Sequence, residues 1–310
     1  MSTGAPIRIG QRVREALRAD LPVVALESTV ITHGLPRPRN LEAAQRLESV
    51  VEEAGAVPAT IGVLAGEVVV GLDANELEHL ARADAEKVSL WNLAAVVARR
   101  ADAGTTVAVT LWAAHQAGLD VFATGGIGGV HDVPFDESAD ISALARFPVL
   151  TVCAGPKSIL DASATLERLE TAGVPVVGYR SSRLAGFILR ETDLPLPARV
   201  DSPEEAAAVL QAQRRLGLSS GVVLSNPVSS GLAPDEFAAL RERAEEELRA
   251  RGVRGRDATP FLLAELARIS GGRTVEVNTR LLEENAALAA QVAAACRRLA
   301  GDTRPVGGRA

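Results

Sequence analysis

Residues 120–158 read DVFATGGIGGVHDVPFDESADISALARFPVLTVCAGPKS and contain two apolar runs that predict strands. The first, Asp120–Thr124, runs into a series of glycines, and the second, Val149–Cys153, runs into Ala154-Gly155-Pro156-Lys157-Ser158. Neither strand alternates apolar with polar residues, which is typical of strands that helices cover on both faces of a parallel sheet. A strand, a glycine-containing loop and a helix together form the repeating unit of an α/β fold.

The same unit recurs along the rest of the chain. Further apolar runs predict strands at Pro22–Leu26, Ala59–Leu64, Val174–Gly178 and Gly221–Ser225. Amphipathic or alanine-rich segments predict helices at Asn40–Ala54, Ala74–Ala83, Leu90–Ala101, Thr106–Ala117, Ser158–Ala172, Pro203–Leu216, Pro234–Ala250, Pro260–Ile269 and Thr279–Leu299. We therefore expect a layered α/β/α fold with a largely parallel central sheet. No linker separates two domains, so residues 1–310 are expected to form a single domain, with 301–310 as a flexible tail.

Composition and charge narrow the class of protein. The chain has 310 residues, of which 47% are hydrophobic and 23% charged, which excludes a disordered chain. The net charge is −6, so we expect neither a nucleic acid nor an anionic membrane as a partner. No apolar run reaches the ~20 residues of a membrane span. No signal peptide begins the chain and its two cysteines suit a reducing compartment, so we expect a cytoplasmic protein.

Lysine is rare in this chain. Of the 33 basic residues, only Lys87 and Lys157 are lysine, and all the others are arginine. Arginine stays protonated, whereas a lysine amine can lose its proton and act as a nucleophile. Each lysine is therefore a candidate for chemistry that arginine cannot perform, unless drift has simply left two ordinary lysines.

The position of Lys157 favours a reactive amine. It follows a strand and precedes a predicted helix, with Pro156 suited to the first helical turn. A helix N-terminus disfavours a cation by ~0.3–1 kcal/mol, which makes the neutral amine that forms a Schiff base more available. The alternative is an exposed lysine whose charge Asp161 compensates.

The glycine run Gly125–Gly129 does not match a nucleotide-binding motif. Gly126 and Gly128 could begin G-x-G-x-x-G, but His131 stands at the third glycine position, and no acidic residue ends the next strand. Lys157 follows a proline, which excludes a P-loop. The run remains compatible with a turn whose N–H groups bind an anion, and equally with a purely structural turn.

Three further segments could carry chemistry. Glu27 directly follows a strand, where a partly buried carboxyl would have a raised pKa and could act as a general acid, although it could equally cap a turn. Lys87 could contact a phosphate or be a surface lysine. Gly104-Thr105-Thr106 opens a predicted helix whose free N–H groups could hold a phosphate, unless Thr105 is a plain N-cap.

Three carboxylates gather between the two strands predicted within residues 120–158. Asp136, Glu137 and Asp140, with His131 nearby, indicate a divalent ion on oxygen ligands, for which one carboxylate plus water is a common arrangement. Solvated loop carboxylates are the alternative. Zinc is disfavoured because no cysteine or histidine pair has ligand spacing.

Long stretches of the chain resemble the pseudouridine-5′-phosphate glycosidase family. The matching segments are VALEST at 24–29 with His33-Gly34, VPATI at 57–61, KVS at 87–89, GTTVA at 104–108, VFATGGIGGVH at 121–131, VCAGPKSILD at 152–161 and TPFLLA at 259–264. Together they extend over about residues 6–300.

This resemblance implies an enzyme that reversibly cleaves the C–C glycosidic bond of pseudouridine 5′-phosphate to uracil and ribose 5-phosphate. It implies a metal-dependent homotrimer, usually with Mn²⁺, one ion per subunit. By resemblance, Lys157 forms the covalent bond to C1′ of the ring-opened sugar, Glu27 is the proton donor and Asp136 is the metal ligand. The implied substrate contacts are Lys87, Val107 through its backbone, His131, Ser138, Ala139, Asp140 and Asn278.

The chain departs from the family pattern at three places. The loop between His131 and Phe135 is about three residues shorter. Glu137 replaces an apolar residue beside Asp136, where a second carboxylate could alter the choice of metal, and Pro156 replaces a small residue before the lysine.

Two other classes of protein share parts of the pattern. A Schiff-base aldolase acting on a phosphosugar would also use Lys157 and a phosphate loop, but it would release no uracil. A regulator that binds a nucleotide or a sugar phosphate would need no reactive lysine.

Overall fold

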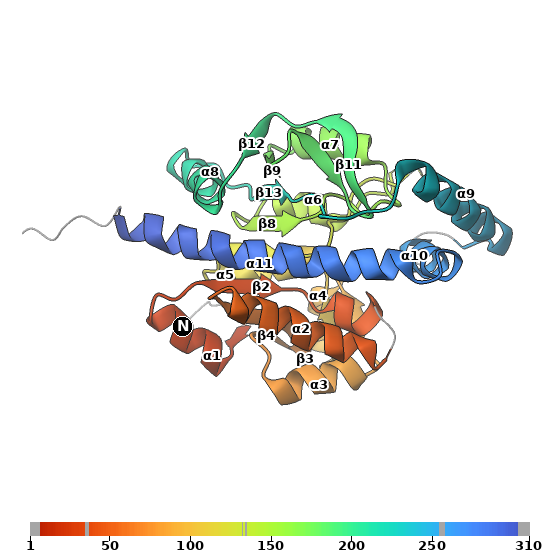
Figure 1. The fold of residues 1–310 in the computed structure, drawn as a ribbon. Helices are drawn as coiled ribbons and strands as arrows, with labels where there is room; N and C mark the ends of the chain where they lie inside the picture. Colours follow the sequence, from red (N-terminus) through yellow and green to blue (C-terminus); the bar gives the residue numbers. More distant parts are fainter. Residues whose placement is uncertain (1–6, 35–36, 132, 134, 254–257, 303–310) are drawn as a thin grey trace, which may run out of the picture.

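The central strands divide their side chains between two hydrophobic layers. In β2 (Val23–Leu26), Val24 and Leu26 belong to one buried cluster, and Val23 and Ala25 belong to the other. Strands β8 (Leu150–Cys153) and β13 (Val222–Ser225) divide in the same way. The computed structural model, which describes residues 7–34, 37–131, 133, 135–253 and 258–302, therefore has helices on both faces of its sheet (Figure 1).

The main sheet has eleven strands, nine of them in the order β1–β4–β3–β2–β7–β8–β13–β9–β12. The bounds not yet given are β1 (Ile7–Ile9), β3 (Val57–Leu64), β4 (Glu67–Val70), β7 (Val121–Ala123), β9 (Val176–Tyr179) and β12 (Ala198–Val200). Strand β6 (Ala103–Thr105) pairs with β3 and with β5 (Glu86–Val88). Among the described strands of this sheet, only the pairings of β3 with β4 and β6 are antiparallel, so the predicted fold class is confirmed. Strands β10 (Arg183–Gly186) and β11 (Leu189–Pro195) form a separate antiparallel hairpin.

Helices cover both faces of the main sheet. On one face, α11 (Arg273–Asp302) crosses the molecule and packs on α2 (Arg39–Glu53) and α8 (Pro203–Arg215), as Figure 1 shows. The opposite layer contains α1 (Gln11–Arg18), α5 (Val107–Gln116), α6 (Ala139–Leu144) and α7 (Ala162–Thr171). The other helices are η1 (Val30–Gly34), α3 (Ala74–Arg82), α4 (Leu93–Ala98), α9 (Pro234–Arg251) and α10 (Ala258–Ile269).

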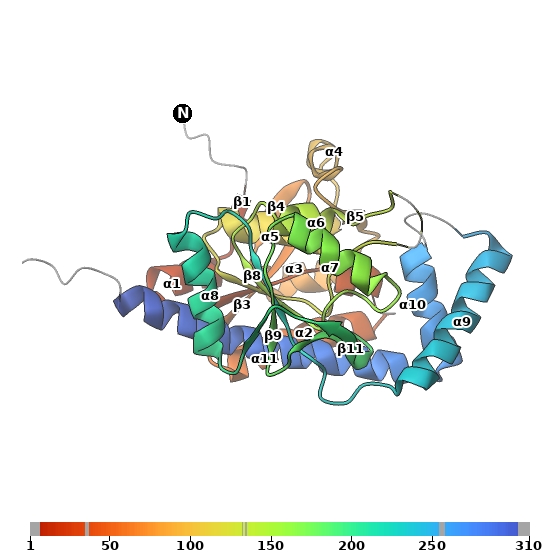
Figure 2. The same cartoon turned by 90° about the horizontal axis from the view of Figure 1, so that it is seen from above.

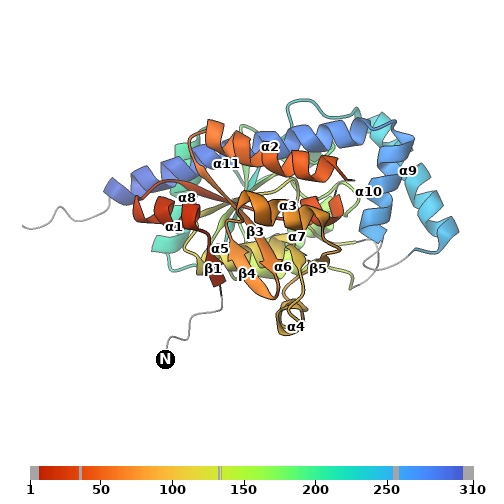
Figure 3. The ribbon, with the colours of Figure 1, turned by 90° about the horizontal axis from the view of Figure 1, so that it is seen from below.

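Two helical parts extend away from the layers. Helices α9 and α10 lie together beyond one end of the sheet, next to the start of α11 (Figure 2). Helix α4 projects from the body near β5, as both Figure 2 and Figure 3 show.

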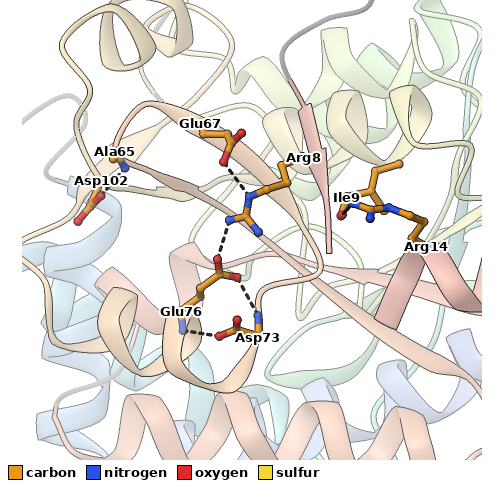
Figure 4. Close-up of polar contacts among 8 residues, drawn as sticks. All are labelled: Arg8, Ile9, Arg14, Ala65, Glu67, Asp73, Glu76 and Asp102. Atoms are coloured by element: carbon orange, nitrogen blue, oxygen red, sulfur yellow. Dashed lines mark hydrogen bonds and ion pairs between the residues drawn. The ribbon is translucent and has the colours of Figure 1, made fainter. Parts of the chain in front are cut away.

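The edge strand β1 is tied to its neighbours by Arg8 (Figure 4). The guanidinium contacts Glu67 on β4 at 2.7 Å and Glu76 on α3 at 2.6 Å. Glu76 also completes a capping box with Asp73, in which each side chain accepts the other residue's backbone N–H. One carboxylate therefore caps α3 and helps to hold the edge strand.

Most predicted elements are present, with some shifted ends. The helix predicted from Ser158 begins at Ala162, the one predicted from Thr279 begins at Arg273, and Leu90–Ala101 contains helix only over Leu93–Ala98. Helices α1, α6 and η1 were not predicted, and neither were the short strands β1, β4, β5, β6, β10, β11 and β12. Of the predicted tail, residues 301–302 belong to α11, and 303–310 lie outside the described residues.

Candidate active site

Four neighbouring parallel strands end at one edge of the sheet. Strands β2, β7, β8 and β13 lie side by side in this order. Glu27 follows β2, Thr124 follows β7, Asn226 follows β13, and the segment containing Lys157 follows β8. Ligands of open α/β sheets bind beyond the carboxyl ends of the strands, so these side chains define the candidate site.

The Glu27 carboxyl group lies in a largely buried position beside a hydroxyl. The Thr124 hydroxyl donates a short hydrogen bond to Oε1 of Glu27. Burial raises the pKa of Glu27 above its ordinary value, and the negative charge of Asp140 raises it further. The charge of Lys157, the hydrogen bond from Thr124 and the charge of Lys87 lower this pKa, but burial outweighs them.

The charges of both lysines of the chain act on Glu27. Each of the two amines is close enough for its charge to act on the Glu27 carboxyl group. Burial around the amine lowers the pKa of Lys87, and the charge of Lys157 lowers it further, while Asp140 and Glu27 oppose the change. An acid and two amines from distant parts of the sequence thus influence one another's charge.

Lys157 does not lie in the first turn of a helix, so that prediction is wrong. Helix α7 begins at Ala162, and Asp161 is its N-cap, with a carboxylate that accepts the Ala164 N–H at 2.9 Å. Because Lys157 precedes this cap, the predicted effect of a helix dipole on its amine does not apply. Asp161 is occupied in capping α7 rather than in compensating Lys157.

The segment before α7 is fixed to the glycine run instead. Pro156 forms a parallel bridge with Ile127, and the Lys157 N–H donates to the Ile127 carbonyl at 3.1 Å. Asp161 forms a second bridge, with Val130. The backbone of Lys157 is therefore positioned by the exit of β7, the strand that also positions Thr124.

The start of α5 is anchored to the end of β2. The Thr105 N–H donates to Oγ of Ser28 at 2.9 Å, and the hydroxyls of Thr105 and Ser28 donate to the Ile61 carbonyl at 2.8 and 2.6 Å. Thr105 is therefore buried, and the N-cap of α5 is Thr106, whose side chain makes no capping hydrogen bond.

Asp140 replaces the missing cap. Its Oδ1 accepts the Ala108 N–H at 3.1 Å, and its Oδ2 accepts the Gly128 N–H at 2.8 Å, so one buried carboxylate joins α5 to the glycine run. The Thr106 hydroxyl is left buried, and no described residue hydrogen-bonds to it. Beside it, the N–H of Val107, the first helical residue, has no acceptor within the helix. Both donors therefore stand without an acceptor among the described residues, at a helix N-terminus, which favours an anion.

The glycine run allows two close approaches. A Cβ at Gly128 would lie 2.3 Å from Oγ of Ser138, and one at Gly126 would lie 2.7 Å from the Phe187 ring. Ser138 is the N-cap of α6, and its Oγ accepts the Asp140 N–H at 3.2 Å. Packing thus accounts for glycine at these two positions, as in the structural interpretation of the run.

The loop before α6 brings Asp136 and His131 together. The His131 N–H donates to the Asp136 carbonyl at 2.9 Å, and Glu137 pairs with Arg168 at 2.9 Å. Within the described part of the chain, no three His, Cys, Asp or Glu side chains gather to hold a metal. A cation at Asp136 would therefore take its other ligands from water or substrate, an arrangement that Mg²⁺ and Mn²⁺ accept. Ala139, the first helical residue of α6, lies next to this loop.

Helix α11 contributes a buried amide. The Asn285 Nδ2 donates to the carbonyls of Thr124 at 2.9 Å and Gly125 at 3.3 Å, and its Oδ1 accepts from Asn226 at 2.9 Å. Asn278 is partly buried seven residues earlier, two turns along the same side of the helix. The sequence analysis missed Thr124 and Asn285, although a threonine at the end of an apolar strand was an available signal for the first.

A cavity of about 470 Å³ lies between the β10–β11 hairpin, the segment containing Lys157 and the start of α9. Its lining includes Lys157, Ser158, Asp161, Gly186 and Phe237. The volume falls within the range of about 300–1,000 Å³ that is usual for small-molecule sites. Glu27 and Lys87 do not line the cavity, so it adjoins the acid–amine cluster only through Lys157.

A family model and several curated relatives match this chain over most of its length. Residues 12–295 match the family model described as indigoidine synthase A like protein. A pseudouridine-5′-phosphate glycosidase of Thermus thermophilus is 57% identical over 88% of this chain and 97% of its own length. One of Salinispora tropica is 52% identical over 93% of this chain and 91% of its own length.

Solved structures agree in fold. The structure of a prealnumycin C-glycosynthase, AlnA, in complex with ribulose 5-phosphate is similar with a TM-score of 0.88 and 35% identity, over 96% of this chain and 98% of that one. An indigoidine synthase A-like protein of Thermotoga maritima has a TM-score of 0.87 and 35% identity, over 96% of this chain and 99% of that one. Across the described helices of the present chain, none combines the length and apolar character that a membrane crossing requires.

Proposed function

The chain belongs to the family of indigoidine synthase A like proteins that includes the pseudouridine-5′-phosphate glycosidases, and from this premise we propose that it cleaves the C–C glycosidic bond of pseudouridine 5′-phosphate, reversibly, to uracil and ribose 5-phosphate. Members of this family are enzymes. The observation that supports the proposal most strongly is the place of Glu27 and Lys157 beyond the ends of strands β2 and β8, with the charges of Lys157 and of Lys87 on β5 both acting on the Glu27 carboxyl group.

The bond to be broken demands such a cluster. A uracil carbanion at C5 is a poor leaving group, so a pair of carboxylates of the usual glycosidase type would not suffice. An amine bonded to C1′ supplies an electron pair that drives the cleavage, and an acid supplies the proton that C5 needs. Lys157 and Glu27 match these two requirements.

The proposed reaction has three steps. First, the Lys157 amine attacks C1′ in its unprotonated form, the C1′–O4′ bond breaks and opens the ribose ring, and O4′ takes the proton that the attacking nitrogen loses. Next, Glu27 gives its proton to C5 of uracil while the C1′–C5 bond breaks, and the nitrogen lone pair forms the C1′=N iminium. Finally, water hydrolyses the iminium, which releases ribose 5-phosphate and restores the Lys157 amine.

The raised pKa of Glu27 supports its role as the proton donor. A general acid must hold its proton near the working pH, and an ordinary carboxylic acid has lost it there. At Glu27, burial shifts the pKa in the direction that this role requires. The two lysine charges limit the rise, which keeps the proton transferable.

The substrate phosphate is proposed to bind at the start of α5. The Val107 N–H and the Thr106 hydroxyl lie unpaired at a helix N-terminus, which attracts anions. Burial and the charge of Lys157 lower the pKa of Lys87, and a phosphate dianion beside it would oppose this change. The other proposed substrate contacts are His131, Ser138, Ala139, Asp140 and Asn278.

A divalent metal, Mn²⁺ as the first candidate, is proposed at Asp136. The carboxylate of Asp136 has no hydrogen-bond or ion-pair partner in the described part of the chain, whereas Glu137 is engaged by Arg168. This donor set fits a hard cation that keeps several waters. When bound, the ion would order water and substrate oxygens near the loop.

The setting is proposed to be the reducing cytoplasm, where free thiols are the rule. Cys153 and Cys296 are free and buried in this chain. Burial raises the pKa of both thiols to about 12, so neither is a reactive thiolate.

The direct test is release of uracil from pseudouridine 5′-phosphate, followed by the change in ultraviolet absorbance and confirmed by chromatography. We expect stoichiometric uracil and ribose 5-phosphate, and resynthesis of the substrate from the two products. An enzyme that consumes ribose 5-phosphate without uracil, or releases no uracil at all, would contradict the proposal and favour an aldolase or a binding protein.

A further inference from the structure

The Thr124 hydroxyl and the Glu27 carboxyl group form a pair between two strand exits. Thr124 is only 2% exposed, and its hydroxyl donates to Oε1 of Glu27. The Oε2 of Glu27 takes part in no hydrogen bond with the described residues. The two oxygens of this acid are therefore not equivalent.

The backbone of Thr124 is itself held on both sides. Its N–H donates to the Val152 carbonyl at 3.1 Å, and its carbonyl accepts from Asn285 at 2.9 Å. Asn285 is fully buried, and its amide oxygen accepts from Asn226 at 2.9 Å. A chain of hydrogen bonds thus runs from the exit of β13 through α11 to the exit of β7 and ends at Glu27.

We propose that Thr124 is a positioning residue for proton transfer: its hydroxyl holds Oε1 of Glu27 as the carbonyl oxygen of the neutral acid, so that Oε2 carries the proton to C5 of uracil. A carboxylic acid bears one proton, and an oxygen that already accepts a strong hydrogen bond is the poorer place for it. This inference rests on the proposed function, because it assigns a direction to the proton that Glu27 delivers.

The same hydrogen bond affects the acidity of Glu27. The charged groups that face this carboxyl group are Lys157, Lys87 and Asp140. Thr124 adds an uncharged donor that favours the ionised form, and so it opposes the rise in pKa that burial causes. Removal of the hydroxyl should therefore raise the pKa of Glu27 further and leave the orientation of the acid free.

The test compares three variants in the pH dependence of kcat for uracil release. Thr124→Val keeps the shape of the side chain and removes the hydroxyl, whereas Thr124→Ser keeps the hydroxyl. Thr151→Val on β8 is a matched control, because Thr151 is a fully buried threonine whose hydroxyl has no hydrogen-bond partner in the described ranges of the chain. Thermal unfolding of each variant shows that it is folded at the assay temperature.

In Thr124→Val, kcat should fall about tenfold. The decline of activity at high pH should also move upward by about one pH unit. Both changes have the size expected for the loss of one hydrogen bond to a charged group. Thr124→Ser and Thr151→Val should keep the wild-type profile. An unchanged profile in Thr124→Val, or an equal shift in Thr124→Ser, would overturn the inference.

A second measurement separates this inference from the proposed function. Ribose 5-phosphate with borohydride should label Lys157 equally in wild type and in Thr124→Val, because imine formation with the free aldehyde does not need a proton on uracil C5. Absence of uracil release from the wild type would refute the proposed function. Normal release by the wild type together with an unmoved profile in Thr124→Val would refute the role of Thr124 alone.

Discussion

Glu27 combines a catalytic requirement with a cost in stability. Burial raises its pKa in the folded protein above the ordinary value of 4.5, so the folded state binds the proton more tightly than the unfolded state does. The stability that this proton gives is fully present below about pH 4.5 and is lost as pH rises through the raised pKa. The residue that we propose as the acid therefore destabilises the fold at neutral pH.

Glu27→Gln should separate these two effects. Turnover should fall by about 10²-fold or more, because the amide cannot donate a proton to carbon, a contribution of general acids that is typically 10²–10⁴. As pH increases from 4.5, the wild type should lose stability that the variant keeps. The free energy of unfolding of the variant should therefore increase relative to that of the wild type. Urea unfolding at several pH values measures this difference. A constant difference across the pH range would show that the Glu27 pKa is not raised.

Asp136 is the residue on which the proposed metal depends. Chelation should remove activity and added Mn²⁺ should restore it, and Asp136→Asn should weaken Mn²⁺ binding as measured by paramagnetic resonance of the free ion. Glu137→Gln is the matched control, since Arg168 engages Glu137 and the substitution should leave Mn²⁺ affinity nearly unchanged. Full activity after complete chelation, or equal Mn²⁺ binding by Asp136→Asn and the wild type, would contradict the metal assignment.

Among the elements, the segment between β8 and α7 is the one whose geometry decides the position of the lysine. Gly155 has φ +82°, and a Cβ there would lie 2.2 Å from the carbonyl oxygen of Ala185 on β10. The hairpin β10–β11 can thus rest directly on the turn that leads to Lys157. Any side chain at Gly155 would push the hairpin and this turn apart.

Gly155→Ala should therefore destabilise the protein more than backbone strain alone would. Gly118→Ala provides the control, because Gly118 has φ +72° with nothing within 4 Å of its added Cβ. We expect a loss of about 1–2 kcal/mol in Gly118→Ala, the cost of a left-handed conformation, and clearly more in Gly155→Ala. Urea unfolding provides both values, and equal losses would contradict a tight contact between the turn and the hairpin.

The elements also show what the sequence could and could not predict. Strands β2, β8 and β13 were predictable because helices cover both faces and leave continuous apolar runs. Strands β5 and β6 were missed because three residues carry too short a pattern. Pro156 imitates a first helical turn, yet bridges to the glycine run move the helix start to Ala162.

The candidate site was predictable to a similar extent. Glu27 and Lys157 could be found because chemistry gathers where parallel strands end, and because lysine is so rare here. Thr124 offered a signal, a threonine at the end of an apolar strand, that was not used. Asn285 offered none, because its role depends on how α11 is placed across β7, which no local pattern encodes. The direction in which each side chain points could not be predicted from the sequence either.

For the whole molecule, we propose a homotrimer. Large apolar side chains are exposed at Trp91, Val133, Phe135, Leu216 and Leu218. Light scattering coupled to size exclusion should give a mass three times that of the 32.3 kDa chain. A mass that stays at one chain across the concentrations used for assay would contradict the trimer.

The central claim is that Lys157 forms a covalent bond to the sugar, and the other proposals depend on it. The measurement is intact-mass and peptide spectrometry after incubation with pseudouridine 5′-phosphate and borohydride, with Lys157→Arg beside the wild type. We predict one reduced sugar-phosphate adduct per chain, located at Lys157, and neither adduct nor uracil in the arginine variant. Undiminished turnover by Lys157→Arg, or an adduct only at Lys87, would contradict it.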